Sequence, residues 1–283
     1  MSFDANEHRR ESLAGWEEAA TGWVRRADII RSLGAPVSAW MLDAVSLQPG
    51  ERVLELAAGL GETGMMAAEQ VAPMGGVIIS DQAESMLAGA RARAQELELS
   101  NLEFRVLNAE WIDLPVASVD AVLCRWGYML MADPAAALGE TRRVLRPGGR
   151  VGLAVWDSVT ENPWSALPAA ELIERGLLPR PAPGTPSPFA LGDPLRVREL
   201  LEQAGFTEIE VTSVELAYRT PSFEAFWDTS LDVSRGFHDA VLGSPEPEIE
   251  EIRAGLQRRL APFTGADGSL DIPARTLVAR AVA

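Results

Sequence analysis

The stretch Val53-Leu-Glu-Leu-Ala-Ala-Gly-Leu-Gly-Glu-Thr-Gly64 decides the fold of this chain of 283 residues. Its apolar start ends in an acid at Glu55, a glycine turn follows at Gly59 and Gly61, and a helical pattern runs from Met65 to Val71. A strand, a glycine turn and a helix in this order let the backbone approach a nucleotide, because a Cβ atom at those glycines would collide with the ligand. The stretch also fits the dinucleotide pattern G-x-G-x-x-G, so the turn by itself does not decide between nucleotide cofactors. The acid four residues before the first glycine favours a cofactor other than a dinucleotide.

The composition is typical of a globular enzyme with one large core. Hydrophobic residues make up 47% of the chain and charged residues 23%, and its length leaves room for a nucleotide-binding domain plus insertions. The apolar runs are too short to span a bilayer, and residues 1–10 are polar and mixed in charge, so we expect no signal peptide and a cytoplasmic location. The single cysteine, Cys124, excludes an intrachain disulfide and a cysteine metal cluster.

The charge balance argues against a nucleic-acid partner. The formal net charge is −16, whereas a nucleic-acid binder gains much of its affinity from cations on phosphates. We therefore expect a small-molecule substrate. All 25 basic residues are arginine, which excludes a lysine Schiff base, a pyridoxal phosphate anchor, a Walker-type lysine and a Tyr/Lys dehydrogenase pair.

Strands and helices alternate along most of the chain. Such a rhythm of short apolar strands and amphipathic helices predicts an α/β fold with a doubly wound, mostly parallel sheet of seven strands covered on both faces. We expect strands over residues 52–56, 77–80, 102–107, 119–124, 150–156, 208–216 and 276–282, and a turn over 146–149. We expect helices over residues 8–47 with a break at Pro36, and over 85–97, 134–144, 164–177, 194–204 and 221–263.

Two segments interrupt this rhythm and predict a helical lid over a pocket. The first contains a proline-rich stretch over 179–188 that cannot form helix. The resulting organisation is an N-terminal helical cap (1–47), a nucleotide-binding core (48–157), a lid insertion (158–192), a continuation of the core (193–220), a helical lid insertion (221–263) and a last core strand (264–283).

Polar side chains follow the first three predicted strands, where ligands of doubly wound sheets bind. Asp81 comes about twenty residues after the glycine turn, where a carboxylate can accept hydrogen bonds from ribose hydroxyls. Asn108-Ala-Glu110 follows the third strand, where an amide and backbone groups can bind an adenine edge. An NAD site shares the turn and the ribose acid, so these features leave the cofactor open.

Four motifs in order resemble class I S-adenosylmethionine-dependent methyltransferases of the ubiquinone/menaquinone-biosynthesis type. Leu54–Gly61 is similar to the first motif of that family, Ser80–Leu87 to its segment after strand two, Asn108–Pro115 to its third segment, and Val144–Gly149 to the turn before strand five. The resemblance runs from about residue 16 to 156 and returns weakly in the last strand. It implies a Rossmann-like methyltransferase fold and S-adenosylmethionine as cofactor, with S-adenosylhomocysteine as product and no metal.

The resemblance also implies roles for individual residues. Asp81 would bind the ribose, Gln82 and Asn108 would lie at the adenine, Arg125 near the methionine amino group, and Trp23 on a helix closing over the cofactor. The implied cofactor-binding residues are Trp23, Glu55, Ala57, Gly59, Gly61, Asp81, Gln82, Met86, Asn108, Ala109, Glu110 and Arg125. The chain departs from the family pattern in having Asn108 for Asp, Ala58 for Cys and Leu60 for Thr.

Candidates for a general base are few, because the chain has two histidines, His8 and His238. His238 lies beside an acid in the second lid insertion, which could bring it over the methyl group; a solvated helix histidine is the alternative interpretation. Tyr128 after strand four is predicted as pocket wall or proton relay, and Asp157 at the end of strand five as a lining residue.

We therefore predict methyl transfer to a small apolar or aromatic molecule, with O- or C-methylation favoured over N-methylation. Aromatic and methionine side chains cluster after strands four and five and in the lid insertions. The alternatives are a non-catalytic S-adenosylmethionine-binding or regulatory module and an NAD-dependent oxidoreductase. We expect no nucleic-acid partner and no membrane insertion, and we leave a homo-oligomer open.

Overall fold

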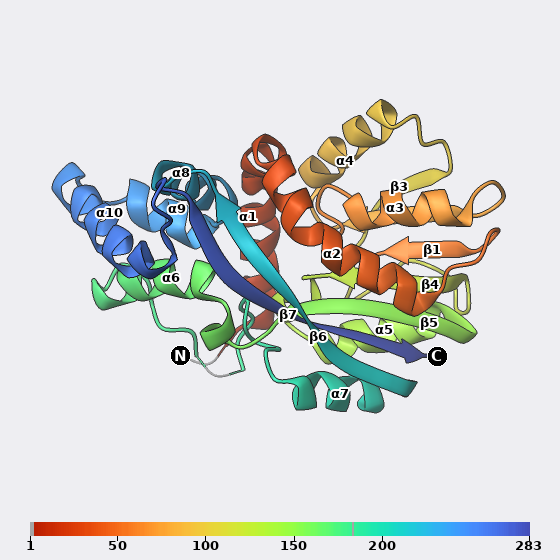
Figure 1. The fold of residues 1–283 in the computed structure, drawn as a ribbon. Helices are drawn as coiled ribbons and strands as arrows, with labels where there is room; N and C mark the ends of the chain where they lie inside the picture. The colour runs from red at the N-terminus through yellow and green to blue at the C-terminus, as the bar shows by residue number, and fades with distance from the viewer. Residues whose placement is uncertain (1–2, 183) are drawn as a thin grey trace.

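The computed structural model describes residues 3–182 and 184–283, which form one sheet of seven strands in the order β3-β2-β1-β4-β5-β7-β6 (Figure 1). Neighbouring strands run parallel except where β7 pairs with β5 and β6. The predicted doubly wound, mostly parallel sheet is confirmed. The strands are β1 (Arg52–Glu55), β2 (Gly76–Asp81), β3 (Leu102–Val106), β4 (Val119–Arg125), β5 (Leu145–Trp156), β6 (Thr207–Thr220) and β7 (Leu270–Val282).

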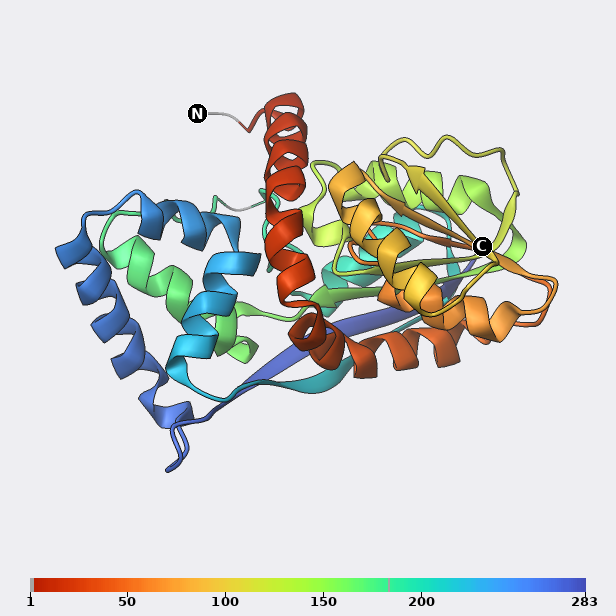
Figure 2. The same cartoon turned by 90° about the horizontal axis from the view of Figure 1, so that it is seen from above.

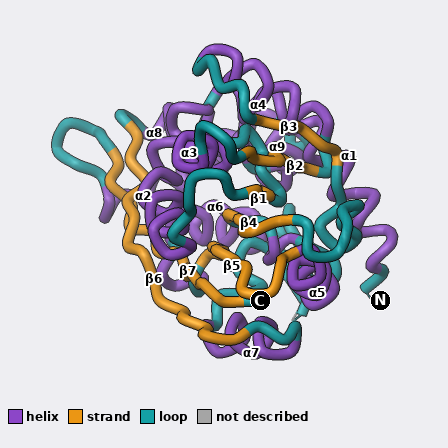
Figure 3. Tube along the Cα trace, turned by 90° about the vertical axis from the view of Figure 1, so that its right-hand side faces the viewer, coloured by secondary structure: helices purple, strands orange, loops and turns teal. Residues whose placement is uncertain are grey.

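Helices cover both faces of the sheet, each through its own apolar cluster (Figure 3). One face carries α2 (Ala27–Val45), α3 (Glu62–Val71) and α4 (Glu84–Glu96), and the other carries α5 (Pro134–Val144) and α7 (Pro194–Gln203). Because both faces are covered, the central strands are buried over most of their length, as is typical of parallel strands.

The lid packs as a separate helical cluster beside the sheet (Figure 2). It consists of α6 (Pro163–Glu174), α8 (Phe223–Val233), α9 (Arg235–Leu242) and α10 (Glu246–Leu260). Leu172 of α6 packs with Phe226 of α8 and Ile252 of α10, so the two predicted insertions meet in one core. The outer halves of β6 and β7 reach into that core through Tyr218 and Ile272. Helix α1 (Ala5–Arg25) stands between the lid and the sheet (Figure 2).

The predicted helix break at Pro36 was wrong, because α2 runs through it and the chain bends at Arg26 instead. Pro36 is exposed, so water can solvate the carbonyl left without its partner. Gly34 and Met41, on either side of the proline, both lie on the buried face of α2. Packing against the sheet therefore outweighs the local cost of the proline.

Several predicted boundaries also shift. Helix α3 begins at Glu62 rather than at residue 65, and β6 and β7 extend well beyond 208–216 and 276–282. The predicted turn over 146–149 is part of β5, where the pairing with β4 passes from Val119↔Leu145 to Ala121↔Arg150. The extra residues form an irregularity with Gly148 at φ 77°, so the glycines mark a bulge within the strand.

Within the described ranges, no helix combines the length and the hydropathy that a bilayer crossing needs.

Candidate active site

A pocket opens at the carboxyl ends of β1, β2 and β4, and α1 and α2 supply part of its wall. All but Glu55 and Gly61 of the predicted cofactor-binding residues line it, namely Trp23, Ala57, Gly59, Asp81, Gln82, Met86, Asn108, Ala109, Glu110 and Arg125. The described residues hold no group of His, Cys, Asp or Glu that could ligate a metal ion.

Asp81, the last residue of β2, holds the glycine turn that follows β1 through hydrogen bonds. Its Oδ2 accepts the backbone N–H of Gly59 at 2.8 Å, and its Oδ1 accepts that of Ala83 at 3.0 Å. Burial raises the pKa of the Asp81 carboxyl, against the lowering effect of these hydrogen bonds. Each carboxylate oxygen retains a further lone pair, so Asp81 can also accept hydroxyl groups of a ligand.

Glu55 and Gly61 support the glycine turn on the side away from the pocket and do not line the pocket. Glu55 is 2% exposed, and its Oε2 accepts the backbone N–H of Gly64 in the first turn of α3 at 2.9 Å. Burial raises the pKa of the Glu55 carboxyl to about 8. A Cβ atom at Gly61 would lie 3.2 Å from Ile79, and its φ of 78° favours glycine. Their predicted role in direct cofactor binding is thereby corrected to support of the loop.

Arg125 and Glu62 form a buried pair on the pocket wall, with side chains 8% and 10% exposed. The guanidinium Nη2 lies 3.6 Å from Glu62 Oε2, and Nε donates to Thr63 Oγ1 at 3.2 Å. Within the described residues, Arg125 Nη1 and Glu62 Oε1 are buried without a hydrogen-bond partner. Burial lowers the pKa of Arg125, although the two nearby carboxylates oppose this. Both residues line the pocket, and each has one buried polar atom without a hydrogen-bond partner.

Two neighbours fix the position of the guanidinium. A Cβ atom at Gly34 of α2 would lie 1.6 Å from Arg125 Nη1, so glycine leaves the space that the side chain fills. On another side, the Arg125 Cζ lies 4.8 Å from the centroid of the Trp126 ring, in a cation–π contact. Trp126 in turn donates from Nε1 to Thr276 Oγ1 at 3.0 Å and stacks on Trp156.

The opposite end of the pocket is lined by the segments after β2 and β3. Asn108 Oδ1 accepts the backbone N–H of Glu110 at 2.8 Å, which orders the loop. Glu110 pairs with Arg9 of α1, and Gln82 Nε2 donates to Ser12 Oγ of α1 at 3.1 Å. Helix α1 is therefore joined to the sheet side by polar contacts at this end.

The pocket also contains Arg9, Ser12, Trp16, Ile30 and Glu62, which were not predicted from the sequence, and His8, which was passed over in favour of His238. Glu62 carried a signal, since it directly follows the glycine turn. His8, Ser12, Trp16 and Trp23 recur at helical spacing, although the spacing does not reveal which element that face covers.

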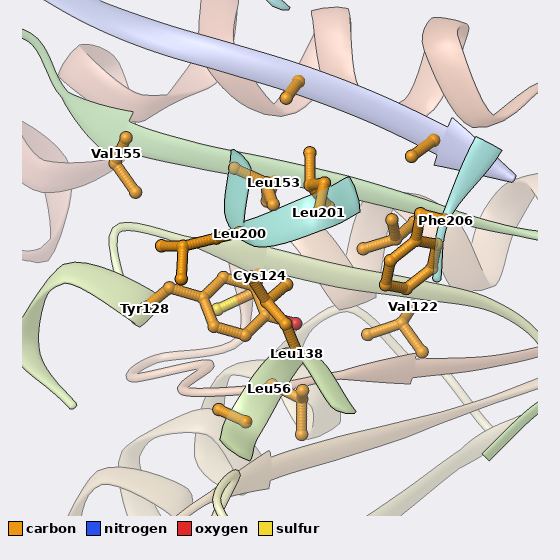
Figure 4. Packing of buried hydrophobic residues seen from close by; sticks show 14 of the residues in the cluster. Leu56, Val122, Cys124, Tyr128, Leu138, Leu153, Val155, Leu200, Leu201 and Phe206 are labelled. Carbon is orange, nitrogen blue, oxygen red and sulfur yellow. The ribbon is translucent and has the colours of Figure 1, made fainter. Parts of the chain in front are cut away.

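The three predicted catalytic residues are not among the residues that line this pocket. Tyr128 is 1% exposed beneath α5 and α7, where its hydroxyl lies 2.6 Å from Thr141 Oγ1 (Figure 4). Burial raises its pKa. Asp157 accepts from Arg275 Nε at 2.6 Å. The Nδ1 atom of His238 lies 3.1 Å from the Leu231 carbonyl oxygen within the lid.

Comparisons with known proteins show the family of this chain. Residues 47–175 match the model of a family described as methyltransferase domain. The chain is 30% identical over 212 residues to nocamycin O-methyltransferase of Saccharothrix syringae, covering 70% of this chain and 75% of that protein. It is 41% identical over 125 residues to demethylmenaquinone methyltransferase of Thermus thermophilus, covering 42% of this chain and 54% of that protein. Two further relatives are matched over 35% and 49% of their own lengths.

The fold has solved counterparts. The YcgJ protein of Bacillus subtilis is similar with a TM-score of 0.58 at 18% sequence identity, covering 88% of this chain and 98% of that one. The sequence relatives include enzymes of ubiquinone and menaquinone biosynthesis, which confirms the resemblance deduced from the four motifs. The sheet order, the glycine turn held by Asp81 and the sequence relatives together show that the chain belongs to the S-adenosylmethionine-dependent methyltransferases.

Proposed function

We propose that this protein transfers a methyl group from S-adenosylmethionine to a small apolar or aromatic molecule, on oxygen or carbon. The observation that carries the proposal is the buried pair of Arg125 and Glu62, each with one unsatisfied polar atom, on the wall of the pocket that Asp81 also lines. S-adenosylmethionine has an α-carboxylate and an α-ammonium at one end and a ribose beyond them. Arg125 would bind the carboxylate, Glu62 the ammonium and Asp81 the ribose hydroxyls.

This arrangement revises the expected role of Arg125. The resemblance placed it near the methionine amino group, but two cations repel each other at such a distance. Glu62 is the group with the charge that an ammonium needs. The same pair argues against NAD, because a dinucleotide offers no amino-acid zwitterion and Glu62 would repel its pyrophosphate.

The reaction depends chiefly on positioning. When bound, S-adenosylmethionine supplies a methyl group on a positively charged sulfur. Asp81, Arg125 and Glu62 would fix both of its ends, and Trp23 of α1 lies close above Gly59, where it would exclude water. Alignment of the reacting groups can contribute about 7–11 kcal/mol of the barrier reduction.

The apolar wall supports an apolar acceptor. Leu130, Met131 and Trp126 line the pocket, and Trp126 lies beside Arg125. Two of the relatives carry the names nocamycin O-methyltransferase and demethylmenaquinone methyltransferase.

Calorimetric titration tests the proposed cofactor site. S-adenosylhomocysteine is expected to bind the wild type, and Glu62→Gln is expected to weaken binding by about 1–3 kcal/mol because a charged hydrogen bond is lost. The ligand 5′-methylthioadenosine lacks the amino-acid end, so its affinity should not change in the variant. Glu69→Gln on the exposed side of α3 is the matched control.

Two results would count against the proposal. Equal weakening of both ligands by Glu62→Gln would show a general disturbance of the pocket. Binding of NADH in place of S-adenosylhomocysteine would contradict the assignment of the cofactor.

A further inference from the structure

His8, the histidine that sequence reasoning passed over, lies in the wall of the cofactor pocket. It sits in the first half of α1, and its Nε2 is 3.1 Å from the main-chain carbonyl oxygen of Leu130. A carbonyl oxygen can only accept a hydrogen bond, so Nε2 carries the hydrogen in this contact. In the neutral imidazole the lone pair is then on Nδ1, which makes Nδ1 the basic atom of the ring.

The acidic groups that line the same pocket are engaged in other interactions. Asp81 accepts two backbone N–H groups, and Glu110 accepts from Arg9 and from the backbone N–H of Ala132 at 2.9 Å. Glu62 faces Arg125. The lone pair on Nδ1 of a neutral imidazole can accept a proton, which is the requirement for a general base.

The charged groups around His8 are largely compensated. On α1, Arg9 is paired with Glu110, and Asp4 accepts the backbone N–H groups of Asn6 and Glu7 as the helix cap. Glu7 itself is exposed. The contacting 3-10 turn, Tyr128–Leu130, bears no charged side chain, and the next acid along the chain, Asp133, caps α5 through Ala136 N–H at 3.0 Å.

We propose that His8 Nδ1 is the general base that accepts the proton of a hydroxyl-bearing acceptor, a phenol or an enol, during O-methylation. This inference rests on the proposed function and narrows it to oxygen as the acceptor atom. The acceptor O–H bond breaks with its electron pair left on oxygen, the proton passes to Nδ1, and the oxygen forms a bond to the methyl carbon. The S–CH₃ bond breaks with its electrons on sulfur, which becomes a neutral thioether, and the imidazolium later releases its proton to water.

The apolar neighbours of His8 fit a ring-shaped acceptor. Leu130 and Met131 line the pocket next to His8, and Trp126 lines it further toward Arg125. Such a wall can hold the ring of a phenol while the hydroxyl reaches the imidazole.

The matched pair of variants is His8→Gln and His238→Gln. A glutamine side chain can still donate an N–H to the Leu130 carbonyl, so it keeps the attachment of α1 but has no basic nitrogen. His238 lies in the lid outside the pocket, so its variant controls for the loss of a histidine. Unchanged affinity for S-adenosylhomocysteine in both variants shows that the fold and the cofactor site are intact.

The probe is 4-nitrophenol, whose ionisation is visible by absorbance, added to the complex with S-adenosylhomocysteine over a range of pH. We expect bound nitrophenol to ionise at lower pH than free nitrophenol in the wild type and in His238→Gln, and this shift to disappear in His8→Gln. With S-adenosylmethionine, His8→Gln should lower the rate of nitrophenol methylation by about 10²–10⁴-fold.

An equal shift in His8→Gln would overturn the proposal, as would a failure of nitrophenol to bind or to shift in the wild-type complex. Failure of the wild type to bind S-adenosylhomocysteine at all would instead contradict the proposed function, so the two failures can be told apart.

Discussion

Replacement of Gly34 by alanine should separate cofactor binding from stability. A Cβ atom at this position would lie 1.6 Å from Arg125 Nη1, the far end of a flexible side chain that can move away. We therefore expect the fold to persist while the guanidinium leaves its place on the pocket wall. In a helix interior, alanine is favoured over glycine by about 0.5–1 kcal/mol, which offsets part of the cost of moving Arg125.

The expected loss of affinity follows from the contact that Arg125 would make. A hydrogen bond to a charged group is worth about 1.5–3 kcal/mol, which corresponds to a roughly 10- to 150-fold rise in the Kd for S-adenosylhomocysteine. The free energy of unfolding should change by less than about 1 kcal/mol. Calorimetric titration measures the first quantity and urea unfolding the second.

Two comparisons make this test specific. Gly139→Ala in α5 meets no atom within 4 Å, so it shows the effect of the helix substitution alone. The affinity for 5′-methylthioadenosine should stay unchanged in Gly34→Ala, because that ligand has no carboxylate. Wild-type affinity of Gly34→Ala for S-adenosylhomocysteine would refute the placement of the carboxylate at Arg125.

Three further variants test the pH dependence and the lid. Burial raises the pKa of Glu55 from 4.5 to about 8, so its contribution to stability is fully present below pH 4.5 and is lost as pH rises through 8. In Glu55→Gln, the free energy of unfolding measured in urea should no longer fall as pH rises through 8. The same pH dependence in the variant and the wild type would contradict this. Burial of Glu171 would raise its pKa, but hydrogen bonds from Arg259 and a second arginine outweigh this and lower it. The contribution of Glu171 to stability is therefore present above pH 4.5 and lost on acidification. Glu171→Gln should lower the free energy of unfolding by about 1–3 kcal/mol at pH 7, and an unchanged free energy at pH 7 would contradict this. Asp232 pairs with two arginines of the α1–α2 junction, and the adjacent Val233 carbonyl accepts from Trp23 Nε1 at 3.3 Å. Asp232→Asn should speed release of S-adenosylhomocysteine in stopped-flow fluorescence by up to about fivefold, and an unchanged rate would show that the lid does not hold Trp23.

The fold and the ribose end of the site could be predicted because their signals are local. The glycine turn, Asp81 and Asn108 each follow an apolar strand directly, and parallel strands bring their carboxyl ends to one edge. Arg125 was placed near the cofactor by the resemblance, and the structure puts it on the pocket wall. The boundaries of β6 and β7 were missed because the outer parts of the two strands pair only with each other, beyond the residues that pair with β5.

The catalytic candidates failed because they depended on tertiary placement. Tyr128 was expected to point at the pocket, but the 3-10 turn over Tyr128–Leu130 reverses the alternation of strand β4 and turns the ring into the core. His238 was chosen over His8 because it lies in the lid. Only the position of α1 across the strand ends shows that His8 is the histidine in the pocket, and no local pattern encodes that crossing.

The hairpin of β6 and β7 has a consequence for how this enzyme could be altered. The two strands pair without interruption from Glu210↔Arg280 to Thr220↔Leu270, whereas β5 joins β7 only over Thr276–Val282. The helices of residues 221–263 are thus inserted at the end of the β6–β7 hairpin, and the chain enters and leaves them at adjacent points. An exchange of residues 221–263 between homologues would therefore replace these helices as one unit, without changing the strand pairing of the nucleotide-binding sheet.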